Sequence, residues 1–157
     1  MASIQITSIV PDQDSKDDVS LRFVREGARR PLAESGNKEL GRAGEDLAAQ
    51  YLAFQGYEIL ERNWRCAFGE ADLIAEDDNG IVLVEVKTRV SSGAWGENIP
   101  ELAVDARKRN KYQKLALMYL SMQTRVDAVR FDVVAINLFD DKSARLRHLV
   151  GAYEWDC

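Results

Sequence analysis

The sequence lacks the features of a membrane protein and of a disulfide-stabilised secreted protein. It has no run of about 18 apolar residues, and its start lacks the basic and apolar regions of a signal peptide. Its two cysteines, Cys66 and Cys157, are too few for a disulfide framework or a four-ligand zinc site. We therefore expect a cytoplasmic protein, without membrane association, whose two thiols are free.

Histidine is also scarce, which limits the chemistry that the chain can support. With His148 as the single histidine, an enzyme built on a histidine base with further histidine ligands is poorly supported. A general base or metal ligand would then be a carboxylate or a lysine. The net charge of -5 argues against a surface that coats nucleic acid everywhere, but it permits a local basic patch.

The remaining composition is that of a globular protein. Hydrophobic residues make up 46% and charged residues 30%, and 157 residues suffice for one hydrophobic core but not for two ordinary domains. Residues 1–36 combine a short apolar start with an acidic and then a basic stretch, which predicts a weakly ordered N-terminal extension. Residues 37–157 are predicted to form the folded domain.

Hydrophobic periodicity predicts the element order α-β-β-β-α-β-β after this extension. The first helix is predicted over residues 38–55, followed by Gly56 as a helix stop. A loop over 91–100 precedes the second helix, which is predicted from Asp105 to about Met122. The buried stripe of this helix is predicted to be Tyr112, Leu115, Tyr119 and Met122. The predicted strands cover residues 57–65, 70–76, 81–88, 130–137 and 146–152.

The predicted strand over 81–88 carries a carboxylate and an ammonium group on one face. Period-two alternation separates Glu85 and Lys87 from the valines on the other face. If residues 77–80 form a four-residue turn, Asp72 lies opposite Glu85; if Asn79 and Gly80 alone form the turn, Asp72 faces Lys87. Both registers place Asp72 on the same face as Glu85 and Lys87, and only a one-residue slip would separate them.

Two carboxylates in this arrangement favour a hard divalent cation. At about 5 Å and an effective dielectric near 20, they repel by roughly 3 kcal/mol unless a cation lies between them. Asp72 and Glu85 would hold Mg²⁺ or Mn²⁺ for phosphodiester hydrolysis, while Lys87 orients the attacking water or stabilises developing negative charge. The same three residues equally fit a solvated cross-strand salt bridge without function.

Further candidates lie on the two helices and in the loop between them. Glu45, at the margin of the first helix's apolar stripe, either reaches a cleft beside the sheet or stays solvated. Trp95 either stacks on an unpaired base or packs the loop onto the core. Five cations of the second helix either contact phosphates or form an ordinary charged surface. These cations are Arg107, Lys108, Arg109, Lys111 and Lys114. We assign no chemistry to Asn63, Trp64, Phe131 or Asp132.

Five ordered segments resemble the YraN-like family of predicted bacterial endonucleases. They are GRAGEDLAAQYL (41–52), NWRC (63–66), FGEADLI (68–74), VLVEVKTR (82–89) and RFDVV (130–134). The resemblance covers about residues 37–137. It implies the restriction-endonuclease-like PD-(D/E)XK fold, which is related to archaeal Holliday-junction resolvases. This is an α/β fold with a central mixed sheet flanked by helices and the core order α-β-β-β-α-β.

The resemblance also implies an active site. Its catalytic residues would be Glu45, Asp72, Glu85 and Lys87, with the three carboxylates as ligands of Mg²⁺ or Mn²⁺ and Lys108 as a phosphate-binding accessory. Ala71 stands where the signature of the fold usually has proline, as in the YraN-like pattern itself.

We therefore expect a magnesium-dependent endonuclease that acts on DNA, with branched or structured DNA as the substrate suggested by the resolvase relationship. Two sites on one branched substrate would require a homodimer. One alternative is a non-catalytic nucleic-acid-binding module of the same fold. A scaffold that binds a protein partner is another.

Overall fold

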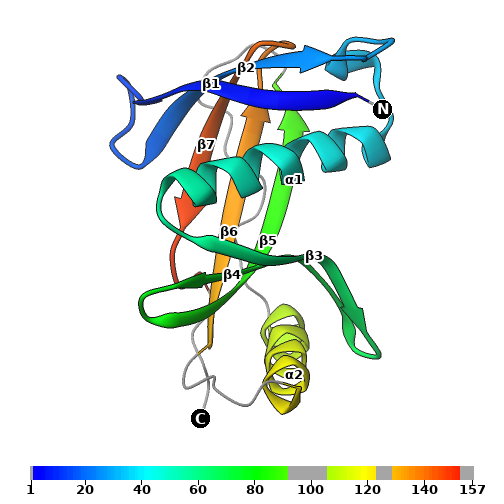
Figure 1. Ribbon diagram of the computed structural model, residues 1–157, viewed down its shortest axis with the longest axis vertical. Helices are drawn as coiled ribbons and strands as arrows, with labels where there is room; N and C mark the ends of the chain where they lie inside the picture. The colour runs from blue at the N-terminus through cyan, green and yellow to red at the C-terminus, as the bar shows by residue number, and fades with distance from the viewer. Residues whose placement is uncertain (1, 92–105, 123–128, 153–157) are drawn as a thin grey trace.

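The computed structural model describes residues 2–91, 106–122 and 129–152 (Figure 1). Its elements, in chain order, are β1 (Ser3–Pro11), β2 (Asp18–Glu26), a short 3-10 helix η1 (Leu32–Glu34), α1 (Asn37–Phe54), β3 (Glu58–Cys66), β4 (Gly69–Asp77), β5 (Gly80–Val90), α2 (Ala106–Ser121), β6 (Val129–Leu138) and β7 (Ser143–Leu149). The predicted order of two helices and five strands is confirmed, with boundaries that shift by at most about three residues. None of the described helices is long and apolar enough to cross a membrane.

The described strands form one mixed sheet in the order β1-β2-β7-β6-β5-β4-β3. Neighbouring strands are antiparallel except β5 and β6, which run parallel. A parallel pair requires a crossover connection, and here the crossover contains α2. The protein is therefore an α/β protein with a mixed sheet flanked by helices, as predicted.

Each of the two long helices covers its own face of the sheet. Leu47 and Leu52 of α1 belong to one buried cluster together with Val82 and Val84 of β5. The intervening Leu83 belongs to the other cluster, which α2 covers. The period-two prediction for β5 is thereby confirmed.

The buried stripe of α2 is confirmed at three of its four predicted positions. Tyr112, Leu115 and Tyr119 are buried in the second cluster. Met122 is 64% exposed, because α2 ends at Ser121 and the residue after it no longer follows the helical face. The prediction for Met122 is therefore wrong.

The N-terminal segment is ordered, which corrects the prediction of a weakly ordered extension. β1 and β2 form an antiparallel hairpin, and β2 pairs with β7 in a register that sets Asp18 opposite Arg147. Leu21 and Phe23 are 1% and 2% exposed. The segment therefore enlarges both the sheet and its core.

Polar contacts fix this hairpin at two places. Arg147 Nε donates to Asp18 Oδ1 at 2.6 Å, so part of the acidic stretch is neutralised by β7. On α1, Gln50 Oε1 accepts from Ile6 N and Gln50 Nε2 donates to Ile4 O, both at 2.8 Å. The amide of Gln50 thus occupies backbone groups on the free edge of β1, which would otherwise be open to pairing with another strand.

Candidate active site

The β4–β5 hairpin brings Asp72 and Glu85 together. Leu73 faces Val84 and Glu76 faces Ile81, so the register of the four-residue turn is confirmed and the alternative register is wrong. Continuing the same offset places Asp72 opposite Glu85.

The regular pairing of β4 with β5 ends just before the two carboxylates. Leu73 and Val84 are the last backbone partners at this end, and beyond them Asp72 Oδ2 accepts a hydrogen bond from Val86 N at 2.8 Å. The carboxylate replaces a backbone acceptor at the point where the strands part. Its position is therefore fixed by the backbone of β5, which also carries Glu85.

Glu85 and Lys87 follow the buried central part of β5. Lys87 Nζ lies 3.8 Å from Glu85 Oε1, and the two side chains are 26% and 21% exposed, respectively. Residues two positions apart on a strand share a face, so the ion pair follows directly from the alternation. An ammonium group and a carboxylate are thus held side by side where the strand reaches solvent.

Glu45 is brought to this region by close packing of α1 on β5. A Cβ atom added at Gly44 would lie 1.7 Å from Thr88 Oγ1, so only glycine permits this approach of the helix. Burial raises the pKa of Glu45, and the nearby charge of Asp72 raises it further. The predicted catalytic residues therefore form two groups that share Asp72. One group contains Asp72, Glu85 and Lys87, and the other contains Asp72 and Glu45.

The electrostatic environment of Asp72 disfavours its ionised form. Burial raises the pKa of Asp72, and the negative charges of Glu85 and Glu70 act in the same direction. The hydrogen bond from Val86 N and the positive charge of Lys111 oppose them. Burial is the largest of these effects and the neighbouring carboxylates act with it, so a bound proton or cation would be favoured at Asp72.

Asn63 lies opposite Asp72 and was assigned no chemistry from the sequence. It falls between the pairs Arg62–Leu73 and Trp64–Ala71, and its φ angle is 52°. Its side chain hydrogen-bonds to Glu45 and lowers the pKa of that carboxyl. The sequence signal was weak but real, because asparagine tolerates positive φ better than most residues do.

The regular alternation of side chains along β4 is interrupted at this position. Ala71 packs in the cluster covered by α2, whereas Leu73, two residues later, packs in the cluster covered by α1. In a regular strand these two residues would share a face. Asp72 therefore lies where the side chains of β4 change from one face of the sheet to the other. It interacts electrostatically there with Glu45 of α1 and Lys111 of α2.

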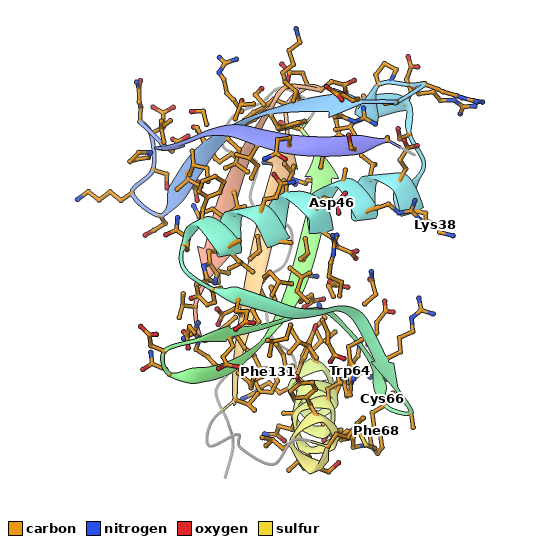
Figure 2. The ribbon with its side chains drawn as sticks, viewed as in Figure 1. Lys38, Asp46, Trp64, Cys66, Phe68 and Phe131 are labelled. Carbon is orange, nitrogen blue, oxygen red and sulfur yellow. The ribbon has the colours of Figure 1, made fainter. Side chains whose placement is uncertain are left out.

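Two cations of α2 gather at the turn between β3 and β4. The stem of Lys111 lies against Gly69, since a Cβ at that glycine would be 2.7 Å from Lys111 Cε. Lys114 Nζ lies 5.7 Å from the centre of the Phe68 ring. Figure 2 shows Phe68 at the hairpin tip beside α2. Arg107 is exposed and Lys108 half-buried in the first turn of the helix, while Trp95 lies outside the described residues.

Comparison with known proteins places the chain in a family. Residues 44–136 match the sequence profile described as uncharacterised protein family UPF0102. The chain belongs to this family. A UPF0102 protein of Thermodesulfovibrio yellowstonii is 50% identical over 115 residues, which are 73% of this chain and 96% of the relative. One from Geobacter sulfurreducens is 43% identical over 127 residues, 79% of this chain and 97% of the relative.

The region shared with UPF0102 contains the whole predicted catalytic set. Its first residue is Gly44, beside Glu45, and it extends past Asp72, Glu85 and Lys87 into β6. Strands β1 and β2 lie outside the matched region. The acidic site, formed by Glu45, Asp72, Glu85 and Lys87, therefore lies within the region that matches UPF0102. The N-terminal hairpin lies outside that region.

The acidic site of this UPF0102 protein offers pairs of oxygen ligands. Within the described parts of the chain, no three histidine, cysteine, aspartate or glutamate side chains come together in an arrangement that would hold a metal ion. Asp72 is coupled separately to Glu85 and to Glu45. Mg²⁺ binds through one or two carboxylates and keeps several waters, so such a pair fits its preferences.

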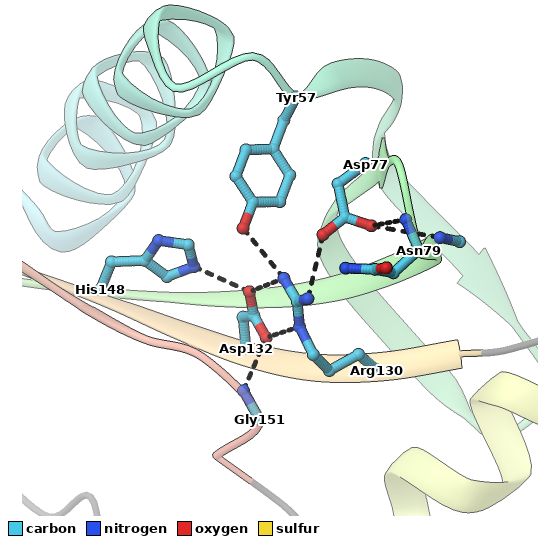
Figure 3. A network of polar contacts seen from close by, with 8 residues as sticks. Tyr57, Asp77, Asn79, Arg130, Asp132, His148 and Gly151 are labelled. Atoms are coloured by element: carbon cyan, nitrogen blue, oxygen red, sulfur yellow. Dashed lines mark hydrogen bonds and ion pairs between the residues drawn. The ribbon is translucent and has the colours of Figure 1, made fainter.

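The buried carboxylate Asp132 of β6 is the centre of a polar cluster that the sequence did not reveal (Figure 3). It is 1% exposed and accepts hydrogen bonds from Arg130 Nε at 2.8 Å and Gly151 N at 2.9 Å, while His148 Nε2 lies 2.7 Å away. Arg130 also contacts Asp77 and Tyr57. Although burial opposes ionisation, the hydrogen bonds hold the pKa of Asp132 below its usual range.

Proposed function

We propose that this UPF0102 protein is a metal-dependent endonuclease that hydrolyses phosphodiester bonds of DNA, with Asp72 at the centre of its active site. The observation that carries the proposal is the environment of Asp72. A partly buried carboxylate is fixed by Val86 N and surrounded by Glu85 and Glu45, with Lys87 beside Glu85. Carboxylates gathered in such a partly buried position suit a divalent cation.

Each residue of the acidic site would have its own role in the reaction. Asp72 and Glu85 would hold Mg²⁺, which supplies charge stabilisation at the phosphate and lowers the pKa of water. The hydrogen bond from Val86 N to Asp72 Oδ2 would hold this carboxylate in position for the cation. Lys87 stabilises the negative charge that develops on the phosphate. Glu45 adds negative charge beside Asp72 and orients water with its half-buried carboxylate.

The topology and the resemblance support the same assignment. The order α1-β3-β4-β5-α2-β6, with a parallel β5–β6 pair, matches the core order implied by the restriction-endonuclease-like resemblance. Lys111 and Lys114, together with Phe68, provide cations and an aromatic ring at the β3–β4 turn for the flanking nucleic acid. A homodimer acting on branched DNA extends this proposal.

These same cations would serve equally well in a nucleic-acid-binding module without turnover. The cations and the aromatic ring at the β3–β4 turn are the observation that favours this second candidate, because they suit phosphate and base contacts whether or not a strand is cut. The two candidates differ in one measurable property, because only the nuclease requires the charge of Asp72 for strand cleavage.

The deciding experiment measures Mg²⁺- and Mn²⁺-dependent cleavage of labelled four-way junction, flap, single-stranded DNA and RNA. Asp72→Asn retains an oxygen that accepts from Val86 N but removes the charge, so it should fold and lose at least about a hundredfold in rate. Asp78→Asn, an exposed aspartate in the β4–β5 turn, is the matched control and should cleave as the wild type does. Cleavage by Asp72→Asn at the wild-type rate would rule out the proposal.

A further inference from the structure

The charges of the N-terminal hairpin are separated between its two ends. The turn between β1 and β2 contains Asp12, Asp14 and Asp17. The other end, where β2 leads into η1, borders a hollow of about 670 Å³. Its cations are Arg22, Arg25, Arg29, Arg30 and Lys142, and Asp141 is the carboxylate in its lining. In a chain of net charge -5, this is a concentrated basic surface.

The carboxylate in this hollow is already paired. Arg25, whose side chain is 6% exposed, lies 3.2 Å from Asp141 Oδ2 and also hydrogen-bonds to Arg30 O. Asp141 Oδ1 accepts from Leu32 N at 2.8 Å. These contacts fix the segment between β2 and η1 and neutralise Asp141. The side chains of Arg22, Arg29, Arg30 and Lys142 are left exposed around the hollow.

A second hollow adjoins this surface and lies along the first half of α1. It has a volume of about 470 Å³, shares Arg25 with the first and is lined by the charged residues Lys38, Glu39, Arg42 and Asp46 of α1. Glu39 is paired with Arg25 and Asp46 with Arg62 of β3, whereas Lys38 and Arg42 are exposed. Figure 2 shows Lys38 at the start of α1 and Asp46 further along the helix.

The exposed cations of α1 lie between the hairpin and Glu45. Lys38, Arg42 and Glu45 are separated by four and three residues, so they share one side of the helix. At 1.5 Å per residue, Lys38 lies about 10 Å from Glu45 along the helix axis, which is about three nucleotides of a duplex strand. Cations therefore lead from the hairpin to the edge of the acidic site.

We infer that the basic end of the β1–β2 hairpin is a second contact surface for the phosphodiester backbone of the nucleic acid whose cleavage we propose at Asp72. The inference rests on that proposed function for the identity of the polyanion. Exposed arginines bind phosphate oxygens through paired N–H groups, and several of them around one fixed segment suit successive phosphates. Because β1 and β2 lie outside the matched UPF0102 region, this surface is an addition to the acidic site.

The test is equilibrium binding of a labelled four-way junction and a duplex at several salt concentrations, in EDTA so that no cleavage occurs. The double variant Arg29→Ala/Arg30→Ala should weaken binding about tenfold and reduce the slope of log K against log salt by about two, one for each lost phosphate contact. Arg29→Lys/Arg30→Lys keeps the charges and should retain most of the slope. Lys16→Ala removes an exposed cation at the acidic end of the same hairpin and should change neither quantity.

Wild-type affinity and slope in the double alanine variant would overturn the inference, as would the absence of binding by the wild type. Displacement of the DNA by millimolar inorganic phosphate would identify a site for small anions and overturn it as well. Arginine-dependent binding by a wild-type protein that cleaves no substrate would uphold the contact surface while removing the nuclease proposal. The two proposals can thus fail separately.

Discussion

Asp72 and Asp132 both lie on inner strands of the sheet, but their surroundings differ in the sign of the charge. Arg130 and His148 surround Asp132 and hold its pKa low. Near Asp72, the carboxylates of Glu85 and Glu70 add to the effect of burial and hold its pKa high. Burial alone therefore does not distinguish the carboxylate that we propose as functional from a structural one. The difference lies in whether the protein itself provides the compensating charge.

The comparison assigns different consequences to removing each charge. Asp132→Asn leaves Arg130 and His148 without their shared anion, and breaking a buried ion pair costs about 3 kcal/mol. We expect urea denaturation to show a loss of this size. Asp72→Asn removes an anion from among anions and should change the free energy of unfolding by less than about 1 kcal/mol, in the stabilising direction. Similar losses in both variants would mean that Asp72 is also a structural carboxylate.

A second prediction concerns the close contact that brings Glu45 to Asp72. In Gly44→Ala the new Cβ would collide with Thr88 Oγ1, so α1 must move away from β5 at a cost of about 1 to 3 kcal/mol. The rate of DNA cleavage should fall by more than the loss in free energy of unfolding would explain, because Glu45 moves with the helix.

Gly41→Ala is the matched control for this prediction. It lies on the same helix, and an added Cβ would have no atom within 4 Å. Alanine there should stabilise the protein by about 0.5 to 1 kcal/mol through helix propensity and leave cleavage unchanged. If both alanine variants behave alike in denaturation and cleavage, the approach of α1 to β5 does not position Glu45.

The two carboxylates also differ in how far the sequence could predict them. Asp72 could be placed opposite Glu85 because they belong to one hairpin with a short turn, so that few registers were possible. The cluster around Asp132 joins β6 to His148 of β7 and to Tyr57 and Asp77 of earlier elements. Those contacts depend on strand order and on residues far apart in the chain, which local patterns do not specify.

The N-terminal hairpin escaped prediction for the same reason. Its strand β2 pairs with β7, more than a hundred residues later, and its acidic turn looked disordered because the cations that neutralise Asp18 were not visible locally. The interrupted alternation at Asn63 and Asp72 could not be predicted for a different reason. It breaks the alternation on which strand prediction depends, and Asn63 itself gave only a weak signal of its positive φ.

A further predicted difference lies in the pH dependence of stability, and its sign distinguishes the two aspartates. The pKa of Asp72 is raised by folding, so between its unfolded and folded values the native protein binds more protons, and its contribution to stability falls as pH rises through that window. The pKa of Asp132 is lowered, so its contribution is present above the unfolded value near 3.8 and is lost as pH falls through the folded value. Lowering the pH from 7 toward the unfolded value near 3.8 should therefore narrow the stability difference between wild type and Asp72→Asn. The deficit of Asp132→Asn should stay nearly constant over the same range.

Magnesium should act on the same difference at neutral pH. A cation bound at tenfold its dissociation constant stabilises the native state by about 1.4 kcal/mol, and this gain should appear in the wild type and in Asp132→Asn but not in Asp72→Asn. Urea denaturation at pH 7 with and without Mg²⁺ measures it. Since protons and Mg²⁺ would relieve the same repulsion between carboxylates, the gain from Mg²⁺ should shrink as the pH is lowered toward the unfolded pKa near 3.8. An equal Mg²⁺ gain in Asp72→Asn would place the cation elsewhere, and the raised pKa of Asp72 would then reflect burial without a metal site.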